Sequence, residues 1–205
     1  MNPLLDSLSE LLGTQRLARL AGVTVGIGGA GGLGSNVALH LVRSGFTRFV
    51  LADFDKVQAG NLNRQFYFPD QIGQLKVYAL AQNLLRLNPD LKLSLQPVHL
   101  TERNMEQIFG SCQVLVEALD DPAAKRMFVE NALKLGKRVV SASGLAGWGD
   151  SDAIRIAGWQ NGRLVIIGDR LTDVKDQPPL APRVGVVAAK QADVVLSWVL
   201  NGVEL

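Results

Sequence analysis

A strand, a glycine-rich loop and a helix follow one another near the N-terminus, and this unit constrains the fold more than any other feature. The β-branched run VTVGI (23–27) predicts a buried strand, the string GIGGAGGLGSN (26–36) follows it, and a helix is expected over 33–44. A second predicted strand, FVLAD (49–53), completes a βαβ unit, whose parallel geometry is close to obligatory. This N-terminal unit predicts an α/β fold.

The glycine string matches the G-x-G-x-x-G fingerprint twice, through Gly26, Gly28 and Gly31 and through Gly29, Gly31 and Gly34. Such a loop brings backbone N–H groups and a helix N-terminus close to phosphate groups, so it predicts a bound nucleotide. Such a loop indicates that a phosphate group is bound, but it does not indicate which reaction the protein catalyses. It is therefore compatible with both NAD and ATP.

The remaining elements continue the alternation of helices and strands. Helical leucine spacing predicts an N-terminal arm over 1–21, broken near Gly13. The segments DAIRIAGW and RLVIIGD flank a Gln-Asn-Gly turn, which predicts an antiparallel hairpin. We therefore predict a Rossmann-like, mostly parallel mixed sheet flanked by helices, with a hairpin extension, in one domain over 1–205. Between arm and C-terminus we expect further helices over 75–87, after Thr101, over 122–135 and over 184–200, and further strands over 91–98, 113–119 and 137–143.

Charge and composition disfavour several classes of protein. The net charge of +2 comes from 21 basic and 19 acidic residues that are interspersed, so nucleic acid is not an expected partner. No apolar run reaches the roughly 20 residues of a membrane span, and Asp6 and Glu10 interrupt the N-terminus where a secretory signal is apolar. We expect a cytoplasmic protein. A single cysteine, Cys112, forms no C-x-x-C pair, so no zinc is expected.

An acid at the end of the second strand leaves the choice of nucleotide open. Asp53 lies about twenty residues beyond the glycine loop, where a dinucleotide enzyme places the acid that binds a ribose hydroxyl. This position fits NAD and ATP equally. A hydride-transfer enzyme also needs a proton-handling residue. The two histidines do not suggest one, because His40 falls inside a predicted helix and His99 at a strand end, and we expect both to be structural.

The residues after the second strand favour ATP. An enzyme that promotes attack on the α-phosphorus needs fixed positive charge around the triphosphate and a carboxylate for magnesium. Arg64 lies in the segment NLNRQ, and Lys76 opens the next predicted helix. Asp120 ends the fourth strand, at the edge of the sheet where ligands bind in such folds.

Two adjacent aspartates are expected to have different roles. Asp121 precedes Pro122, which forces extended geometry on it and places it where a helix N-cap is found. Its carboxylate is therefore expected to accept hydrogen bonds from backbone N–H groups. Asp120 remains available for a magnesium ion.

Six segments together resemble one known family: GAGGLGSN, LADFDKVQAGNLNRQ, IGQLKV, LNP, EALDD and APRVGVVAAKQA. Their order and spacing are similar to those of the ThiF/MoeB family, bacterial relatives of ubiquitin-activating enzymes, from about residue 15 to the C-terminus. The segment ASGLAGWGDSDAIR resembles the compact ThiF subgroup. The resemblance implies an eight-stranded mixed sheet in a homodimer, with ATP at the point where the strand order reverses.

The resemblance also implies a reaction. It implies ATP-dependent adenylation of the C-terminal Gly-Gly carboxylate of a ubiquitin-fold sulfur carrier of the ThiS type in thiamine biosynthesis. Pyrophosphate would be released, and a separate protein would donate sulfur afterwards. The substrate itself supplies the nucleophile, so no catalytic Ser, Cys or His is required. The resemblance also implies roles for single residues. Gly31 and Gly32, in the loop that includes Gly29 and Gly34, would bind phosphate, and Asp53 would bind the ribose. The triphosphate would be bound by Asp55, Asn61, Arg64 and Lys76, and magnesium by Asp120, with Arg64, Lys76 and Asp120 as the catalytic group.

The sequence departs from the family pattern at several positions. Gly60 stands where many members have serine, and the two zinc-binding C-x-x-C pairs of larger members are absent. Larger members supply an arginine from an N-terminal arm to the partner subunit's site, and Arg16 and Arg19 are the candidates here. Cys112 lies just before a strand rather than in a thioester-forming loop, so we expect a structural thiol.

The glycine loop and the cationic residues leave the carrier tail without a binding site. An extended Gly-Gly tail favours a narrow groove walled by small residues, and Gly144, Trp148, Gly185 and Ala189 are the candidates. Other functions stay open: adenylation of a molybdopterin-synthase-type carrier or of another acceptor, such as a carboxylate on a modified tRNA base. An NAD-binding oxidoreductase and a non-catalytic nucleotide-sensing module are the alternatives from other classes.

Overall fold

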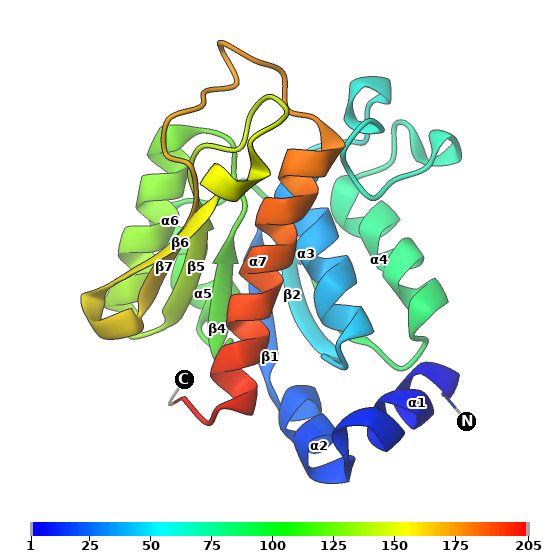
Figure 1. Ribbon diagram of the computed structural model, residues 1–205. Helices are drawn as coiled ribbons and strands as arrows, with labels where there is room; N and C mark the ends of the chain where they lie inside the picture. The colour runs from blue at the N-terminus through cyan, green and yellow to red at the C-terminus, as the bar shows by residue number, and fades with distance from the viewer. Residues whose placement is uncertain (1, 204–205) are drawn as a thin grey trace.

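The chain folds around one twisted sheet, seen in the computed structural model, which describes residues 2–203 apart from the side chain of Gln160. The strand order is β3-β2-β1-β4-β5-β7-β6, and every neighbouring pair is parallel except β6 and β7 (Figure 1). The mixed sheet with its hairpin is thus confirmed, whereas the expected eighth strand is absent from residues 2–203. The strands are β1 Thr24–Gly28, β2 Arg48–Ala52, β3 Lys92–Gln96, β4 Val114–Glu117, β5 Arg138–Ala142, β6 Arg155–Trp159 and β7 Leu164–Gly168.

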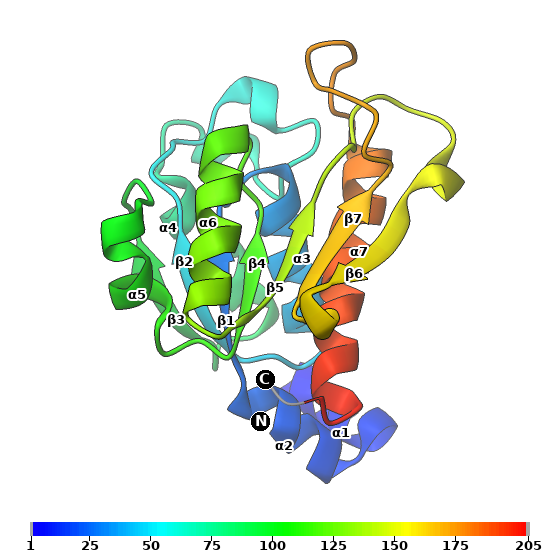
Figure 2. The same cartoon turned by 90° about the vertical axis from the view of Figure 1, so that its left-hand side faces the viewer.

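Helices cover both faces of the sheet (Figure 2). On one face lie α3 Gly32–Arg43, α4 Lys76–Leu87 and α7 Ala181–Leu200, and on the other lie α5 Glu102–Phe109 and α6 Pro122–Lys134. The last helix begins three residues earlier than expected, with Pro182 in its first turn, where a missing N–H costs nothing. Short 3-10 turns span Ala59–Asn61, Pro69–Gln71, Ser151–Ala153 and Gln160–Gly162. None of the helices within residues 2–203 combines the length and apolarity needed to cross a membrane.

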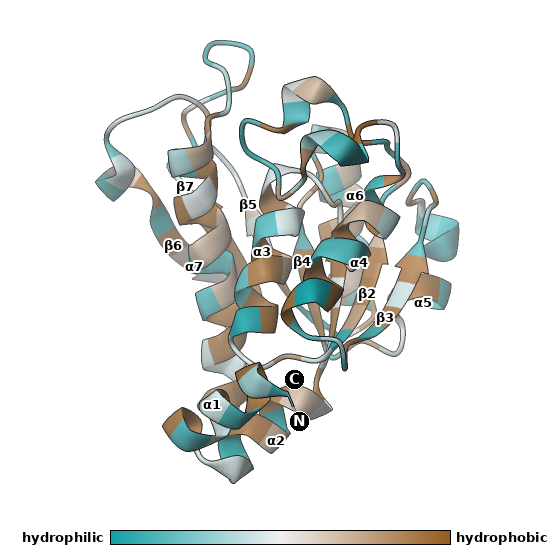
Figure 3. Ribbon diagram, turned by 90° about the vertical axis from the view of Figure 1, so that its right-hand side faces the viewer, coloured by the Kyte–Doolittle hydropathy of each residue, from teal (hydrophilic) through white to brown (hydrophobic). Residues whose placement is uncertain are grey.

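The sheet separates two apolar cores, and the central strands are apolar along most of their length (Figure 3). The larger core packs α3, α4 and α7 on the sheet, with Val37, Leu41 and Leu80 fully buried. The smaller core lies under α5 and α6, where the rings of Phe109 and Phe128 meet edge to face with centroids 5.4 Å apart. Burial on both faces explains why the strands carry near-continuous apolar runs.

The N-terminal arm is two helices, α1 Pro3–Leu12 and α2 Thr14–Gly22, and it breaks at Gly13 as expected. Gly13 has a φ of 79°, which a glycine adopts without strain. The Asn2 side chain donates hydrogen bonds to Asn88 Oδ1 and Asp90 Oδ2, both at 2.7 Å. The arm lies at the end of the sheet opposite the glycine loop (Figure 1).

The turn between β1 and α3 leaves no room for a side chain at Gly34. A Cβ atom added there would overlap the carbonyl oxygen of Gly29, which has a φ of 95°. Gly31, by contrast, has no atom closer than 3.7 Å to an added Cβ. Gly34 therefore lets the helix approach the strand, a packing role.

Gly34→Ala is expected to destabilise the protein, because the new methyl group meets backbone that cannot move aside. We expect the free energy of unfolding to fall by at least about 2 kcal/mol, as in other overpacked cores. Gly31→Ala is the matched control and is expected to leave that free energy nearly unchanged. Urea unfolding of both variants measures the difference, and equal stabilities would contradict the packing role.

Candidate functional site

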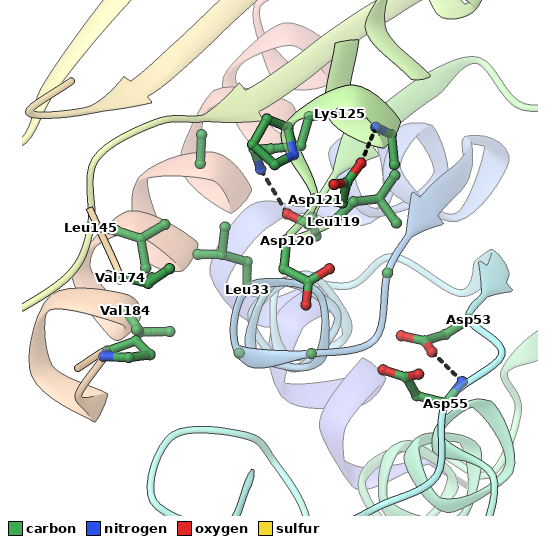
Figure 4. A pocket seen from close by; sticks show the side chains of 18 of the residues that line it. Leu33, Asp53, Asp55, Leu119, Asp120, Asp121, Lys125, Leu145, Val174 and Val184 are labelled. Carbon is green, nitrogen blue, oxygen red and sulfur yellow. Dashed lines mark hydrogen bonds between the residues drawn. The ribbon is translucent and has the colours of Figure 1, made fainter. Parts of the chain in front are cut away.

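A cavity of about 720 Å³ opens at the carboxyl ends of the parallel strands. It lies where the strand order reverses between β1 and β4, the position at which open α/β sheets bind ligands. Figure 4 shows acidic side chains on two sides of this cavity, Asp120 on one and Asp53 and Asp55 on the other. The loops after β1, β2, β4 and β5 therefore form one site.

The glycine loop forms one wall of the cavity. Gly29, Gly31 and Gly32 line it, whereas Gly34 lies behind the loop in the packing role described above. The hydroxyl of Tyr67 donates a hydrogen bond of 2.6 Å to the Ala30 carbonyl. Burial raises the pKa of this phenol above its ordinary value, so the hydroxyl remains a donor. Tyr67 was not predicted from the sequence, yet it holds the loop in place.

Asp53 lies at the carboxyl end of β2, as expected, and lines the cavity. Its Oδ2 accepts a hydrogen bond of 2.6 Å from the N–H of Ala30 in the glycine loop, and its Oδ1 accepts one of 2.7 Å from the N–H of Asp55. Burial raises the pKa of Asp53 despite the nearby charge of Lys76 and these two N–H groups. The carboxylate thus couples the second strand to the glycine loop.

Lys76 opens α4 and lines the cavity, as expected. Its side chain is only 8% exposed, and its Nζ lies 2.7 Å from Asp55 Oδ2. The Asp55 side chain is 46% exposed and reaches the cavity (Figure 4). The two residues form an ion pair at the cavity wall, which brings together two of the residues that the resemblance assigns to the triphosphate.

Arg64 and Asn61 end up in different surroundings. Arg64 lines the cavity, and its Nη1 donates hydrogen bonds to Gly60 O at 3.0 Å and to Asn63 Oδ1 at 2.7 Å. Asn61 is not among the residues that line the cavity, and its Oδ1 accepts a hydrogen bond from Gln58 N and caps a 3-10 turn. The contact with the triphosphate that the resemblance implies for Asn61 stays a prediction.

The two adjacent aspartates behave as predicted from Pro122. Asp121 Oδ2 accepts a hydrogen bond of 2.7 Å from Ala124 N and is the N-cap of α6. Asp120 is exposed to the cavity, and its carboxylate points into it (Figure 4). Within residues 2–203 no hydrogen bond engages that carboxylate.

Lys125, Gln65 and Phe54 are among the residues that line the cavity without having been singled out from the sequence. Lys125 extends from α6 toward the segment that precedes Asp120, and Gln65 is buried with an Oε1 that has no hydrogen-bond partner in the described part of the chain. The rings of Phe54 and His99 pack together with centroids 4.8 Å apart at the cavity rim. His99 therefore lines the cavity, although we expected it to be structural, and its role stays untested. Its place after the third strand of a parallel sheet could have indicated this position.

His40 lies in α3 outside this cavity, as expected for a structural residue. Burial, reinforced by the charge of Arg43, lowers its pKa. It lines a second, smaller hollow of about 220 Å³ between α3 and α7.

The four residues proposed for a carrier tail do not form one groove. Gly144 lines the cavity, whereas Trp148 is 65% exposed and Gly185 does not reach the cavity. Ala189 lines the smaller hollow beside His40. Of the four, only Gly144 lines the main cavity. A Cβ atom added at Gly185 would meet no atom within 4 Å, and Ala189 is exposed, so neither residue is closely packed against another helix.

A buried ion pair fastens the loops beside Gly144. Arg183 of α7 pairs with Asp169, and its Nη1 donates hydrogen bonds to the carbonyls of Gly149 at 2.7 Å and Asp150 at 3.1 Å. Hydrogen bonds from Thr172 and the neighbouring backbone lower the pKa of Asp169, which keeps the carboxylate ionised. The loops after β5 and β7 are thereby joined to the start of the last helix.

A model of the ThiF family matches residues 5–202, which include the whole sheet and every residue of the cavity wall. The chain belongs to the ThiF family. This ThiF-family chain is 37% identical over 135 residues to the adenylyltransferase and sulfurtransferase uba4 of Aspergillus niger, and the match covers 65% of this chain and 28% of the relative. The chain thus spans less than a third of the length of that curated relative.

Solved structures share the fold of this ThiF-family chain. The tRNA N6-threonylcarbamoyladenosine dehydratase TcdA of E. coli in complex with AMP superimposes with a TM-score of 0.80 at 20% identity, covering 96% of this chain and 92% of TcdA. MccB of E. coli, solved with succinimide, gives a TM-score of 0.74 at 20% identity and covers 92% of this chain and 59% of MccB. At 20% identity these structures show similarity of the fold alone, and this similarity confirms the predicted mixed sheet flanked by helices.

The single cysteine of this ThiF-family chain lies away from the cavity. Cys112 is fully buried in the smaller core, beneath α5. Burial raises the pKa of its thiol to about 12, so the sulfur stays protonated. Its burial agrees with the expected structural role.

Proposed function

We propose that this chain is an adenylyltransferase that uses ATP to activate the C-terminal Gly-Gly carboxylate of a ThiS-like, ubiquitin-fold sulfur carrier in thiamine biosynthesis. The observation that carries the proposal is that Arg64, Lys76 and the carboxylate of Asp120 line one cavity together with a glycine loop. Fixed cations and a carboxylate in one cavity suit a magnesium-bound triphosphate. Hydride transfer involves no triphosphate and does not call for this combination.

The cavity wall supports a division of roles around the nucleotide. The N–H groups of Gly31 and Gly32 at the start of α3 would bind phosphate oxygens. Asp53 would accept a hydrogen bond from a ribose hydroxyl, since each of its oxygens keeps a lone pair beyond its backbone hydrogen bond. Arg64 and Lys76 would balance the charge of the triphosphate.

The residues present fit a magnesium ion. Magnesium is commonly held by one or two carboxylates together with phosphate oxygens and water. Asp120 offers such a carboxylate, because it points into the cavity and is not engaged within the described residues (Figure 4). A bound magnesium ion would neutralise part of the triphosphate charge.

The reaction needs no nucleophile from the protein. A carboxylate oxygen of the carrier tail attacks the α-phosphorus, the bond from that phosphorus to the bridging oxygen breaks, and pyrophosphate leaves with the electron pair. The carboxylate is already ionised at neutral pH, so no general base is required. The chain binds and orients the two reactants, and the cations Arg64 and Lys76 stabilise the charge that builds up on the leaving group.

We also propose that the chain forms a homodimer in the cytoplasm. A separate protein would then donate sulfur to the adenylated carrier. The N-terminal arm supports the dimer, because Arg16 and Arg19 are exposed and lie at the opposite end of the sheet from their own cavity (Figure 1). Either arginine would therefore act in the partner subunit's site. The carrier tail would enter beside Gly144, where the loops after β5 and β7 border the cavity.

ATP–pyrophosphate exchange tests the proposed function. Exchange is expected with magnesium and a purified carrier ending in Gly-Gly, and it is expected to stop when the two glycines are deleted, because the attacking carboxylate is then misplaced. Calorimetric titration should show ATP binding and weak or no NAD binding. Exchange that is independent of the carrier, or tight binding of NAD without binding of ATP, would contradict the proposal.

A further inference from the structure

The backbone N–H and C=O groups of Leu119, the residue immediately before Asp120, are held by two charged residues. Leu119 N donates a hydrogen bond of 2.7 Å to Glu117 Oε1, and Leu119 O accepts one of 2.8 Å from Lys125 Nζ (Figure 4). Lys125 Nζ also lies 3.0 Å from Glu117 Oε1. Glu117, Lys125 and the backbone of Leu119 therefore each contact the other two.

The acidic residue among these three is fixed by the core. Glu117 is fully buried, and its second oxygen, Oε2, accepts a hydrogen bond of 2.6 Å from Ser141 Oγ on β5. Gln191 of α7 donates a hydrogen bond of 3.1 Å to the Glu117 carbonyl. A buried carboxylate is retained only when it is paired and hydrogen-bonded. Lys125 supplies the positive charge of that pair.

The neighbours of Leu119 are held by other means. Ala118 N donates to Gly28 O at 2.8 Å and so continues the pairing of β4 with β1. Asp121 is held by its own capping hydrogen bond to Ala124 N. Leu119 and Asp120 lie between these two fixed residues. Within the described residues, Glu117 and Lys125 make the hydrogen bonds that hold the Leu119 backbone.

We propose that Lys125, together with Glu117, is a positioning residue that orients the carboxylate of Asp120 toward the metal of a bound magnesium–ATP complex. This inference rests on the proposed function, since it assumes the magnesium role of Asp120. Lys125 acts through the Leu119 carbonyl, because its Nζ is engaged by that oxygen and by Glu117. Small displacements of a ligating group have large effects on binding and catalysis.

The test compares the affinity for ATP with magnesium and with a chelator. Lys125→Met keeps the length of the side chain and removes both donated hydrogen bonds, whereas Lys125→Arg keeps positive charge and donors. Lys134→Met is the matched control, because Lys134 lies on the exposed end of the same helix. Calorimetry gives the two affinities of each variant, and thermal melting checks its fold.

For Lys125→Met we expect the affinity for magnesium–ATP to fall about tenfold, while the affinity measured with chelator stays within about twofold, a change of under half a kcal/mol. Lys125→Arg should restore most of the loss, and Lys134→Met should behave as the wild type does. In an Asp120→Ala background, Lys125→Met should cause no further loss. These results would support a positioning role over a merely structural one.

Other outcomes would overturn the inference. Equal magnesium dependence in the wild type and Lys125→Met would remove the positioning role and leave the proposed function intact. An equal loss of affinity with and without magnesium, or a Lys125→Arg variant that folds but restores nothing, would assign Lys125 to structure alone. A wild-type affinity for ATP that does not respond to magnesium would remove the role of Asp120 in the proposed function and this inference with it.

Discussion

Asp120→Ala is expected to lower ATP–pyrophosphate exchange by about 10³-fold or more, because a bound metal ion contributes several kcal/mol to stabilising charge in the transition state. The fold should be unaffected, since the carboxylate is exposed to the cavity and is not hydrogen-bonded within the described residues. Exchange kinetics and thermal melting of the same preparation measure the two effects. An active Asp120→Ala variant would contradict the assignment.

The adjacent residue provides the control for that experiment. Asp121→Ala removes the capping hydrogen bond to Ala124 N and should lower the free energy of unfolding by about 1 kcal/mol, as lost N-caps do. Most of the exchange activity should remain. If Asp121→Ala abolished exchange while Asp120→Ala only destabilised the protein, the two roles would have to be reversed.

Lys76→Met is expected to have the second largest effect, a loss of about 10²- to 10³-fold in exchange, which is typical of removing one charged donor from a transition state. The substitution also leaves Asp55 without its partner beside a highly charged triphosphate. Because the Asp55 side chain is half exposed, the cost in stability should stay below about 1 kcal/mol. Pre-steady-state and exchange assays would measure the loss.

Lys56→Met is the matched control for Lys76→Met, because Lys56 lies in the loop between β2 and α4, is exposed and does not line the cavity. We expect it to retain full exchange activity. An equal loss in both variants would mean that the general positive charge of the loop matters, rather than the position of Lys76.

The role of a residue could be predicted from the sequence where a neighbouring residue fixes its backbone geometry. Pro122 restricts the backbone of the residue before it, so the capping role of Asp121 follows from the Asp-Pro pair alone. Asp53 and Lys76 follow from the boundaries of a strand and a helix, because ligands bind at the carboxyl ends of parallel strands. Sequence reasoning therefore located the cavity and most of its charged residues.

Contacts that depend on packing between distant elements could not be obtained in this way. The Glu117–Ser141 hydrogen bond depends on how β4 and β5 align, which neither segment reveals alone. Asn61 caps a turn because the loop folds back on Gln58, a contact that the family resemblance did not indicate. The small residues of α7 do not reveal which way they face: Gly185 and Ala189 lie outside the main cavity, and their role in binding a carrier tail stays a prediction.

The site lies beyond the ends of the strands, so the loops that we propose to select the acceptor are separate from the two cores that stabilise the fold. The two apolar cores lie between the sheet and its helices, while the loops after β5 and β7 are attached to that frame through the Arg183–Asp169 pair at the start of α7. Loops of this kind tolerate insertion and replacement far better than the elements they connect. If the acceptor enters beside these loops, as we propose, exchanging the two loops would change the acceptor while the wall that binds the nucleotide is kept.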